Sequence, residues 1–287
     1  MINLAIAGFG NVGKSLYRLA KNNPHVHLSH VFTSREFNLD VKTFSYDQIE
    51  IAPRVDCTLL ALSSYNQLPH LAKEFLACGN TIDCFDNTDE FDSFVLSLDK
   101  KAKQSETVAL CGAGWDPGLF DVARKHFAPL GKIGTSWGKG MSCGHSNAVR
   151  SIEGVVDAVE WTVPTSIGHT RQVFVTSLGD NKEIEAKIKA IPHYFLGLDT
   201  NVVFVGLEEL KKIKSDFSHQ GKIWFENENH KGQLTLTMKD NPAFTATIMF
   251  NAIPLVVNFC KNKKFGAYTL CDCPLNNFGN FEFDTDK

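Results

Sequence analysis

The first residues that could do chemistry are three glycines near the amino terminus. Gly8, Gly10 and Gly13 have the spacing G-x-G-x-x-G. They follow an apolar run at residues 2–7 and precede a helical pattern at 11–21. In that context the glycines allow a tight turn, a close backbone approach to a pyrophosphate, and close packing of helix on strand. The amino end of the helix then offers free N–H groups and a positive dipole end. Glycines alone often only make turns, but this coincidence predicts a dinucleotide site.

The end of the next expected strand, residues 26–33, indicates which dinucleotide the chain prefers. Enzymes that use NAD usually place an acidic residue there to bind the ribose hydroxyls. This chain has Ser34 and Arg35, a hydroxyl and a guanidinium that suit a 2′-phosphate. We therefore expect NADP as the cofactor. Two alternatives stay open, namely Arg35 as an ordinary solvated charge and Glu36 turned inward to favour NAD.

Aspartates near the ends of two later strands could meet a substrate. Asp86 follows the strand-like segment 81–85, and ligands of open parallel sheets bind outside the carboxyl ends of the strands. An Asx turn or a helix cap explains Asp86 equally well. Asp116 lies beside Trp115 in a glycine-rich segment. With Pro117 at the first helical position, Asp116 would cap a helix, which leaves the large Trp115 unexplained.

A second glycine-rich loop, residues 137–146, collects side chains that could recognise a small polar molecule. They are Trp137, Met141, Ser142, His145 and Ser146. The imidazole of His145 could titrate near neutral pH, although a single histidine is more often a packing or hydrogen-bonding residue. Arg171 begins an expected strand and could hold a carboxylate with its fork of donors. Together these residues indicate a site for a charged small molecule.

The elements that must position these residues form two patterns. Up to residue 117, strands and helices alternate at 2–7, 11–21, 26–33, 57–62, 68–78, 81–85, 89–103 and 107–111. This βαβ order predicts an α/β fold, a doubly wound parallel sheet of the Rossmann type with right-handed crossovers. Beyond it, longer strand-like runs dominate, with strands at 158–163, 171–176, 202–205 and 233–238 and helices at about 147–153 and 182–190. They predict a second, mostly antiparallel α+β domain. A long helix from 243 to about 260 should pack back on the first domain.

Composition limits the classes of function. The 287 residues are 43% hydrophobic and 21% charged, which is ordinary globular composition. The net charge of −3 offers no basic field to nucleic acid. We see no apolar run that approaches the roughly 18–20 residues of a membrane span and no signal peptide. The expectation is a cytoplasmic protein with no nucleic-acid or membrane partner.

The eight cysteines carry no disulfide or metal signal. Most lie in apolar segments, as buried thiols of a reducing compartment do. The one close pair, Cys271 and Cys273, has no second half to complete a zinc site. We expect no metal, and a strand that places both thiols on one face.

Several of these segments resemble, in the same order, the meso-diaminopimelate dehydrogenase family. The similarity runs over nearly the whole chain, and GWDPG followed by the WG-x-G-x-S-x-GHS block is much more specific than the glycine fingerprint. The matching segments are GFGNVGKS (8–15), Ser34-Arg35, TIDCFDN (81–87), GWDPGLF (114–120), WGKGMSCGHSNAVRSIEGV (137–155), TVP (162–164), RQVFV (171–175) and KDNPAFTA (239–246).

The resemblance implies an NADP-dependent homodimer that reversibly oxidises and deaminates the D-configured centre of meso-2,6-diaminopimelate. The implied products are L-2-amino-6-oxopimelate, which cyclises to tetrahydrodipicolinate, with ammonia and NADPH. The implied context is bacterial lysine and cell-wall precursor synthesis. Residues 1–117 with about 243–287 would form the NADP-binding domain, and residues 118–242 the substrate-binding and dimerisation domain.

The resemblance also assigns the candidate site residues. Asp86 and Asp116 would hold the amine of the D-centre, and Asp86, His145 or a bound water would transfer protons. Other substrate contacts are implied for Trp115, Trp137, Met141, Cys143, Gly144, Thr162, Arg171, His219 and Asn241. Cofactor contacts are implied for Gly8, Gly10, Asn11, Val12, Gly13, Ser34, Arg35, Ser63 and Ser64.

Departures from the family pattern keep other functions open. The loop between Thr162 and Arg171 is shorter here than in the best-known members, and Cys143 stands where others carry glutamine or methionine. Compact members resemble this chain more, and some of them accept other 2-keto acids. The alternatives are a broader D-amino acid dehydrogenase, another amino-acid-pathway oxidoreductase such as a dihydrodipicolinate reductase or homoserine dehydrogenase, and a non-catalytic NADP-binding protein. The reductase and homoserine families lack the WDPG and GHS segments.

Overall fold

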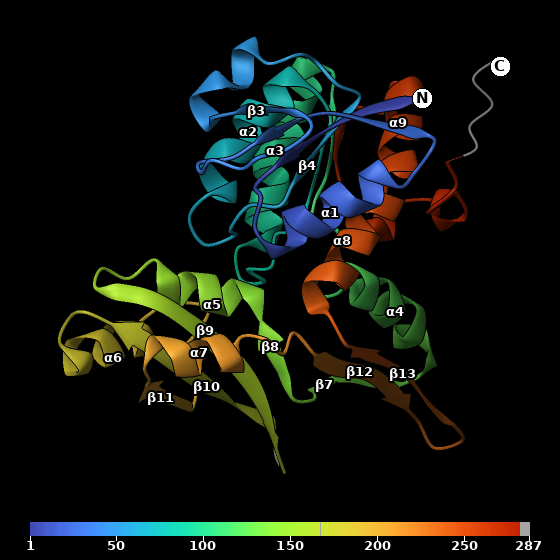
Figure 1. Cartoon of the computed structure of the whole chain (residues 1–287). Helices are drawn as coiled ribbons and strands as arrows, with labels where there is room; N and C mark the ends of the chain where they lie inside the picture. The colour runs from blue at the N-terminus through green and yellow to red at the C-terminus, as the bar shows by residue number, and fades with distance from the viewer. Residues whose placement is uncertain (167, 282–287) are drawn as a thin grey trace. The chain divides into compact units, whose positions relative to one another are not determined.

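The chain divides into two compact units, and each is described by itself (Figure 1). The computed structural model describes residues 1–166 and 168–281. Unit 1 consists of Met1–Val122 and Ala243–Lys287, and unit 2 of Ala123–Pro242.

Unit 1 is built on a seven-stranded parallel sheet. Its order is β14-β6-β5-β4-β1-β2-β3. Because β1 pairs with β2 on one side and β4 on the other, the winding reverses at β1, as a doubly wound sheet requires. The Rossmann prediction is confirmed. The strands are β1 (Ile2–Ala7), β2 (Val26–Phe32), β3 (Lys42–Phe44), β4 (Cys57–Leu60), β5 (Thr81–Asp83), β6 (Val108–Leu110) and β14 (Gly266–Tyr268).

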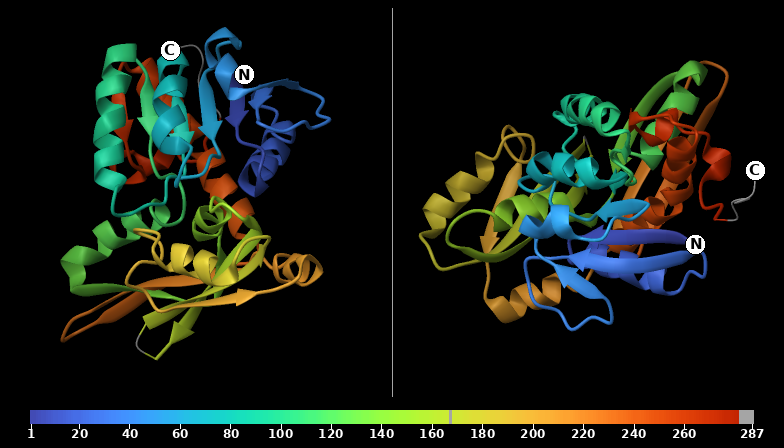
Figure 2. Two further views of the ribbon diagram at one scale, coloured as in Figure 1. Left: turned by 90° about the vertical axis from the view of Figure 1, so that its left-hand side faces the viewer. Right: turned by 90° about the horizontal axis from the view of Figure 1, so that it is seen from above.

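Helices cover both faces of this sheet (Figure 2). On one face, Phe75 of α2 and Phe94 of α3 pack with Phe32 and Leu60 of the strands in one apolar cluster. Helix α1 contacts β1 and β2, and α9 contacts β4, β5 and β6. The helical segments of unit 1 are α1 (Asn11–Lys21), η1 (Tyr46–Ile51), α2 (Leu68–Cys78), α3 (Phe91–Ser105), α9 (Ile253–Lys261), η3 (Leu270–Asp272) and η4 (Leu275–Asn277). In the chain, α4 (Leu119–Phe127) and α8 (Asn241–Asn251) each contain residues of both units.

The helical stretch Asn241–Lys261 corrects one expectation. By length and composition it could span a membrane, with a mean hydropathy of 1.6, although no such run was expected from the sequence. In the structure, 61% of the most apolar 18-residue segment of this stretch is buried. The stretch is divided around Ala252, and Ile253, Leu255 and Val256 of α9 are fully buried. It packs as the core helix of unit 1, where the sequence placed it.

Unit 2 contains two sheets instead of one. A four-stranded sheet has the order β11-β10-β9-β8, and a three-stranded sheet the order β13-β12-β7. Neighbours are antiparallel except β10 and β11, which are parallel. The mostly antiparallel α+β prediction is confirmed. The elements are β7 (Lys132–Trp137), β8 (Gly140–Ser142), α5 (Cys143–Arg150), β9 (Val155–Thr165), β10 (Gly168–Ser177), α6 (Asn181–Lys189), β11 (Thr200–Phe204), α7 (Leu207–Ile213), β12 (His219–Glu226), β13 (Lys231–Met238) and η2 (Ala128–Leu130).

Local capping explains where two helices of unit 2 begin. The hydroxyl of Ser142 accepts a hydrogen bond from the backbone N–H of His145, so α5 starts four residues before its expected position at 147. Asp180 caps α6 in the same way through the N–H of Glu183 at 2.9 Å. The Cys271–Cys273 segment is also corrected, because Cys271 lies in the 3₁₀ turn η3 and not in a strand.

Candidate active site

The three fingerprint positions differ in whether the surrounding atoms leave room for a side chain. Gly8 has a φ of +94°, and a Cβ there would overlap the carbonyl oxygen of Ala61 at the end of β4. A Cβ on Gly13 would overlap the carbonyl oxygen of Gly8. On Gly10, by contrast, a Cβ would meet no atom of the described residues within 4 Å. Packing therefore requires Gly8 and Gly13, while Gly10 faces open space of the kind that a ligand needs.

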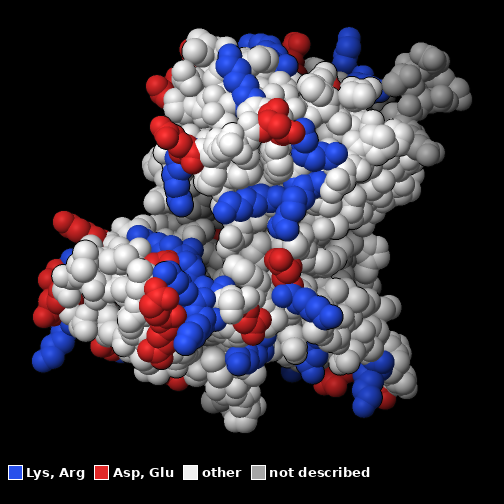
Figure 3. All heavy atoms as spheres, viewed as in Figure 1, with Lys and Arg blue, Asp and Glu red and all other residues white. Residues whose placement is uncertain are grey.

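The amino end of α1 opens onto that space. Gly10 is the N-cap and offers no side chain to the helix, and the first turn, Asn11 to Lys14, carries one basic residue and no acidic one. Asn11 is exposed, and Val12 is partly buried. Basic side chains gather over α1 on this face (Figure 3). Backbone N–H groups, helix dipole and nearby cations make this end of α1 attractive to an anion.

The loop after β2 lies beside the fingerprint turn. The ring of Phe37 packs against that of Phe9, with centroids 4.8 Å apart. The backbone N–H of Arg35 donates to the hydroxyl of Thr33 at 3.2 Å, which shapes the loop. Ser34, Arg35 and Glu36 are all exposed. The hydroxyl and guanidinium proposed for a 2′-phosphate are thus available to a ligand.

The two serines after β4 occupy buried surroundings. The hydroxyl of Ser64 accepts a hydrogen bond from the backbone N–H of Asp86 at 3.1 Å. The backbone N–H of Ser63 donates to the side chain of Gln67 at 3.1 Å. The buried hydroxyl of Ser63 has no hydrogen-bond partner among the described residues. Ser64 therefore connects the end of β4 to the candidate Asp86.

Sequence reasoning missed Asp83, which organises two site loops. Its side chain is fully buried, and its Oδ1 accepts hydrogen bonds from the N–H groups of Phe85 at 3.0 Å and Gly112 at 2.9 Å. Its carbonyl accepts from the N–H of Ala113 at 2.7 Å. Burial raises the pKa of Asp83 to about 6. The available signal was one acidic residue inside an otherwise apolar strand.

The segment around Asp116 differs from its expected structure. Helix α4 begins at Leu119, so Pro117 is not the first helical residue and Asp116 is not its cap. The Asp116–Pro117 peptide bond is cis. Trp115 is buried and packs edge-on against Phe120, with centroids 5.3 Å apart. Asp116 is partly exposed, at the carboxyl end of the sheet where ligands of such folds bind.

In unit 2 the expected loop at 137–146 contains the end of β7, strand β8 and the first turn of α5. Met141 is buried and its carbonyl accepts a hydrogen bond from the side-chain amide of Asn241 at 3.1 Å. Cys143 and Gly144, both partly buried, begin α5. The rings of Trp137 and His219 lie edge to face, 6.3 Å apart. Met141 is therefore a neighbour of Asn241, and Trp137 is a neighbour of His219.

His145 occupies a packed and hydrogen-bonded position in unit 2. Its Nδ1 lies 2.8 Å from the Ser142 hydroxyl, and its ring packs on Tyr194 and Phe195. Burial, and next the charge of Arg171, hold the pKa of His145 well below its usual range. Of the two alternatives left open by the sequence, titration near neutral pH or a packing and hydrogen-bonding role, the structure favours the second.

Arg171 contacts Thr162, which the resemblance also assigns to the substrate, and one residue that sequence reasoning missed. Arg171 and Thr162 are register partners on β10 and β9, and Nη1 donates to the threonine hydroxyl at 2.6 Å. The same nitrogen lies 3.2 Å from Oε1 of Glu160. His219 is 4% exposed, and burial lowers its pKa to about 4. Alternation on β9 was the available signal, since Glu160 and Thr162 share one face.

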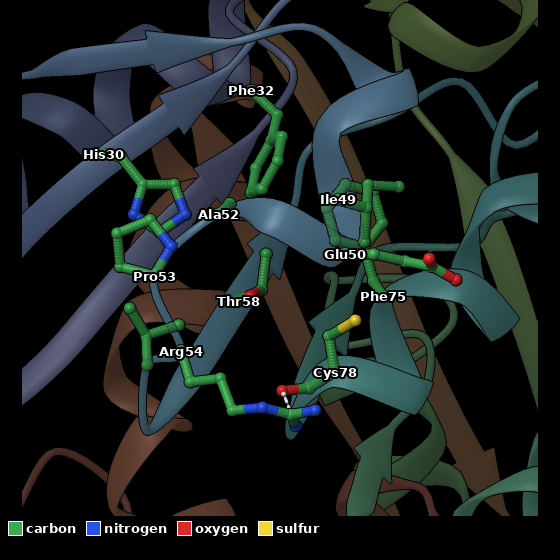
Figure 4. Close-up of a pocket in the computed structure, with 11 residues that line it drawn as sticks. His30, Phe32, Ile49, Glu50, Ala52, Pro53, Arg54, Thr58, Phe75 and Cys78 are labelled. Atoms are coloured by element: carbon green, nitrogen blue, oxygen red, sulfur yellow. Dashed lines mark hydrogen bonds between the residues drawn. The ribbon is translucent and has the colours of Figure 1, made fainter.

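A small hollow in unit 1 lies away from these residues (Figure 4). It has a volume of about 20 Å³, roughly one water molecule. Thr58 at the start of β4 and Cys78 at the end of α2 line it, so it lies toward the amino ends of the strands. Arg54 donates to the carbonyl of Cys78 at 2.9 Å. Its position and size do not suit a dinucleotide or an amino acid. Within residues 1–166 and 168–281 no group of three or more His, Cys, Asp or Glu side chains could hold a metal ion.

The parallel sheet, the glycine turn at its switch point and the carboxylates at its strand ends define a dehydrogenase of the Rossmann class. Residues 114–168 and 165–239 match the family model described as the diaminopimelic acid dehydrogenase C-terminal domain. The meso-diaminopimelate D-dehydrogenase of Acetivibrio thermocellus is 35% identical, over 95% of this chain and 92% of that protein. The chain belongs to the meso-diaminopimelate D-dehydrogenase family, whose members are amino acid dehydrogenases.

Further relatives and solved structures extend the similarity over nearly the whole chain. The meso-diaminopimelate D-dehydrogenase of Corynebacterium glutamicum is 31% identical over 86% of this chain and 85% of that protein. The structure of C. glutamicum DAP dehydrogenase in complex with DAP has a TM-score of 0.88 at 27% identity, covering 96% and 95% of the two chains. An engineered D-amino acid dehydrogenase bound to NADP⁺ has a TM-score of 0.90 at 25% identity, with the same coverage.

Proposed function

We propose that this chain is an NADP-dependent meso-diaminopimelate D-dehydrogenase. It would oxidise and deaminate the D-centre of meso-2,6-diaminopimelate to L-2-amino-6-oxopimelate and ammonia, reversibly, in lysine and cell-wall precursor synthesis. Support comes from relatives of that name and from a structural neighbour solved with the substrate. The alternative of a dihydrodipicolinate reductase or homoserine dehydrogenase has no comparable support.

The observation that carries the cofactor assignment is the contrast among the fingerprint glycines. Gly8 and Gly13 are required by packing, whereas Gly10 leaves open space at the amino end of α1. Exposed Ser34 and Arg35 beside that turn suit an additional phosphate. A structural neighbour at 25% identity was solved with NADP⁺. When bound, the nicotinamide would accept the hydride from the substrate carbon.

Substrate recognition would need both signs of charge, because the substrate carries two ammonium and two carboxylate groups. We assign Asp86 and Asp116 to the ammonium of the D-centre. Arg171 with Thr162 would hold a carboxylate of the L-centre, since a guanidinium binds a carboxylate through paired donors. Neighbouring contacts are assigned to Trp115, Trp137, Met141, Cys143, Gly144, His219 and Asn241.

Deamination also needs a group that moves protons. Loss of hydride from the amine-bearing carbon leaves an imine, water adds to it, and ammonia departs. His145 has a lowered pKa and is therefore a weak base. Asp86 or a bound water is the better candidate for the proton transfer, with His145 in a hydrogen-bonding role through Ser142.

We further propose that the first domain binds NADP, that the second binds substrate and forms a homodimer, and that the protein is cytoplasmic. Exposed leucines of unit 2, such as Leu178 at 89%, are candidates for a subunit contact. Light scattering on the purified chain would measure its mass in solution. A monomer of full activity would contradict the dimer.

The decisive experiment is an NADP⁺ reduction assay with the separated stereoisomers of diaminopimelate and with D- and L-lysine. The proposal expects turnover with the meso isomer and none with the L,L isomer, and far less with NAD⁺. Comparable turnover of D-lysine would instead favour a broader D-amino acid dehydrogenase. Cofactor binding without turnover of any amino acid would favour a non-catalytic protein.

A further inference from the structure

A buried glutamate lies beside the arginine that would receive the distal carboxylate. Glu160 is 0% exposed, and its Oε1 lies 3.2 Å from Nη1 of Arg171, whose side chain is 13% exposed. Both residues belong to unit 2, on the antiparallel strands β9 and β10. The backbone N–H of Glu160 donates to the hydroxyl of Ser146 at 2.9 Å, which anchors the glutamate to α5. The carboxylate of Glu160 is therefore held in place beside Arg171 by the protein itself.

The pairing between the two side chains is incomplete. Nη1 divides its contacts between Glu160 and Thr162, instead of forming the two parallel bonds of a fork. Oε2 of Glu160 and Nε of Arg171 are buried, and neither has a hydrogen-bond partner among the described residues. A buried polar atom without a partner is costly. Arg171 and Glu160 together can therefore form hydrogen bonds with one more polar group.

The other titratable groups near this pair are histidines that remain uncharged. Burial lowers the pKa values of His145, His169 and His219. Burial also raises the pKa of Glu160 to about 7, and the charge of Arg171 opposes that rise. Above neutral pH, where Glu160 is ionised, its carboxylate offsets much of the charge of Arg171.

We propose that Glu160 is a specificity-determining residue that competes with the distal carboxylate of the substrate for Arg171. This inference rests on the proposed function and names a property of that same site. Two anions that share one guanidinium repel each other, so Glu160 weakens binding of a substrate with a distal carboxylate. It leaves binding of D-amino acids without that group almost unaffected. The enzyme is therefore more tolerant of simple D-amino acids than an unopposed arginine would make it.

The test replaces the charge of Glu160 and keeps its shape. Glu160→Gln retains an acceptor for Arg171, and Glu209→Gln is the control, because Glu209 is an exposed carboxylate of unit 2 on α7. Initial rates with NADP⁺ would be compared for meso-diaminopimelate, D-2-aminopimelate and D-2-aminoheptanoate. The last two differ only in the distal carboxylate.

For Glu160→Gln we expect KM to fall about tenfold for both substrates that carry a distal carboxylate, a change of about 1.4 kcal/mol. KM for D-2-aminoheptanoate, and kcat for all three, should stay within about twofold of the wild type. A rise in KM for the dicarboxylates would show that Glu160 orients Arg171, and equal shifts for all substrates would show a general structural effect. Either result overturns the inference.

A second variant covers the case in which Glu160→Gln does not fold. Glu160→Asp keeps the negative charge but places it one methylene farther from Arg171. We therefore expect KM to fall only for the substrates with a distal carboxylate, and by less than in Glu160→Gln. An unchanged or higher KM for the dicarboxylates overturns the inference. Wild-type protein without activity on meso-diaminopimelate would refute the proposed function instead, which keeps the two failures distinguishable.

Discussion

The carboxylate of Asp83 accepts a hydrogen bond from the backbone N–H of Gly112 at 2.9 Å, and so joins the ends of two neighbouring strands. The same oxygen accepts from the N–H of Phe85 at 3.0 Å. The loops that begin at these points carry Asp86 and Asp116. Asp83, which has no assigned contact to substrate, therefore fixes the positions at which the loops carrying Asp86 and Asp116 begin.

The pH dependence of stability should reveal Asp83. Burial raises its pKa from 3.8 to about 6 in the folded protein. The folded chain therefore holds this proton more tightly than the unfolded chain, and the contribution of Asp83 to the free energy of unfolding falls as pH rises from about 4 to 6. The loss is on the order of 3 kcal/mol. Asp83→Asn should gain stability relative to wild type over that interval, as measured by urea unfolding. A difference that is constant with pH would contradict this assignment.

The fingerprint glycines allow a matched pair of variants. Gly13→Ala should destabilise unit 1 by about 3 kcal/mol, because the new methyl group overlaps the carbonyl oxygen of Gly8. Gly10→Ala should cost less than about 1 kcal/mol, as a glycine-to-alanine change at an N-cap does. It should nevertheless weaken NADP⁺ binding at least about tenfold, since the methyl group enters the space assigned to the pyrophosphate. Thermal unfolding without cofactor and fluorescence titration would measure the two effects. If Gly10→Ala and wild type bound NADP⁺ equally well, the pyrophosphate would not lie at this turn.

Arg35 should determine the preference for NADP⁺ over NAD⁺. Arg35→Ala should weaken NADP⁺ binding about tenfold to a hundredfold by removing a charged hydrogen-bond donor, with little change for NAD⁺. Arg54→Ala is the control, because Arg54 is exposed and lies in the hollow toward the amino ends of the strands. Dissociation constants for both dinucleotides would be compared. If Arg35→Ala weakened the binding of NADP⁺ and NAD⁺ equally, Arg35 would contribute only a general electrostatic attraction and would not recognise the 2′-phosphate.

Asp116 should be needed for turnover and not for cofactor binding. Asp116→Asn removes the negative charge assigned to the substrate ammonium, so kcat/KM for meso-diaminopimelate should fall by about 10²–10⁴. The dissociation constant for NADP⁺ should not change. Asp92→Asn, at an exposed carboxylate on α3, provides the control. Wild-type turnover by Asp116→Asn would refute the role of this residue.

His145 should remain neutral across the physiological range. Because burial and Arg171 hold its pKa well below the usual value, its ring should show no protonation step between pH 6 and 8. Nuclear magnetic resonance of the ring nitrogens would follow this directly. A transition centred near pH 6.5 would show that the imidazole is hydrated, and would restore His145 as a candidate for proton transfer.

Short-range patterns explain what could be predicted. The strand, the glycine turn and helix α1 occupy residues 2–21, and their local periodicity was sufficient to place them correctly. The antiparallel register of β9 and β10, which pairs Arg171 with Thr162, was not predictable because it depends on side chains from several segments. The start of α4 was also misplaced: the helix begins at Leu119, and the N–H of Gly118 donates to the carboxylate of Asp121 at 2.9 Å.

By itself the sequence determined the class of sheet, the dinucleotide fingerprint and the set of candidate charges, because these depend on residue types within a few positions of one another. Only the tertiary structure decided their chemical state. Asp83 is 29 residues from Gly112, and Glu160 is 11 residues from Arg171. Burial and long-range partners change pKa values and leave or remove hydrogen-bonding capacity, and neither can be read from local spacing. For that reason the sequence could mark Asp83 and Glu160 as unusual acidic residues within strands, but their partners and pKa values followed only from the pairing of the strands.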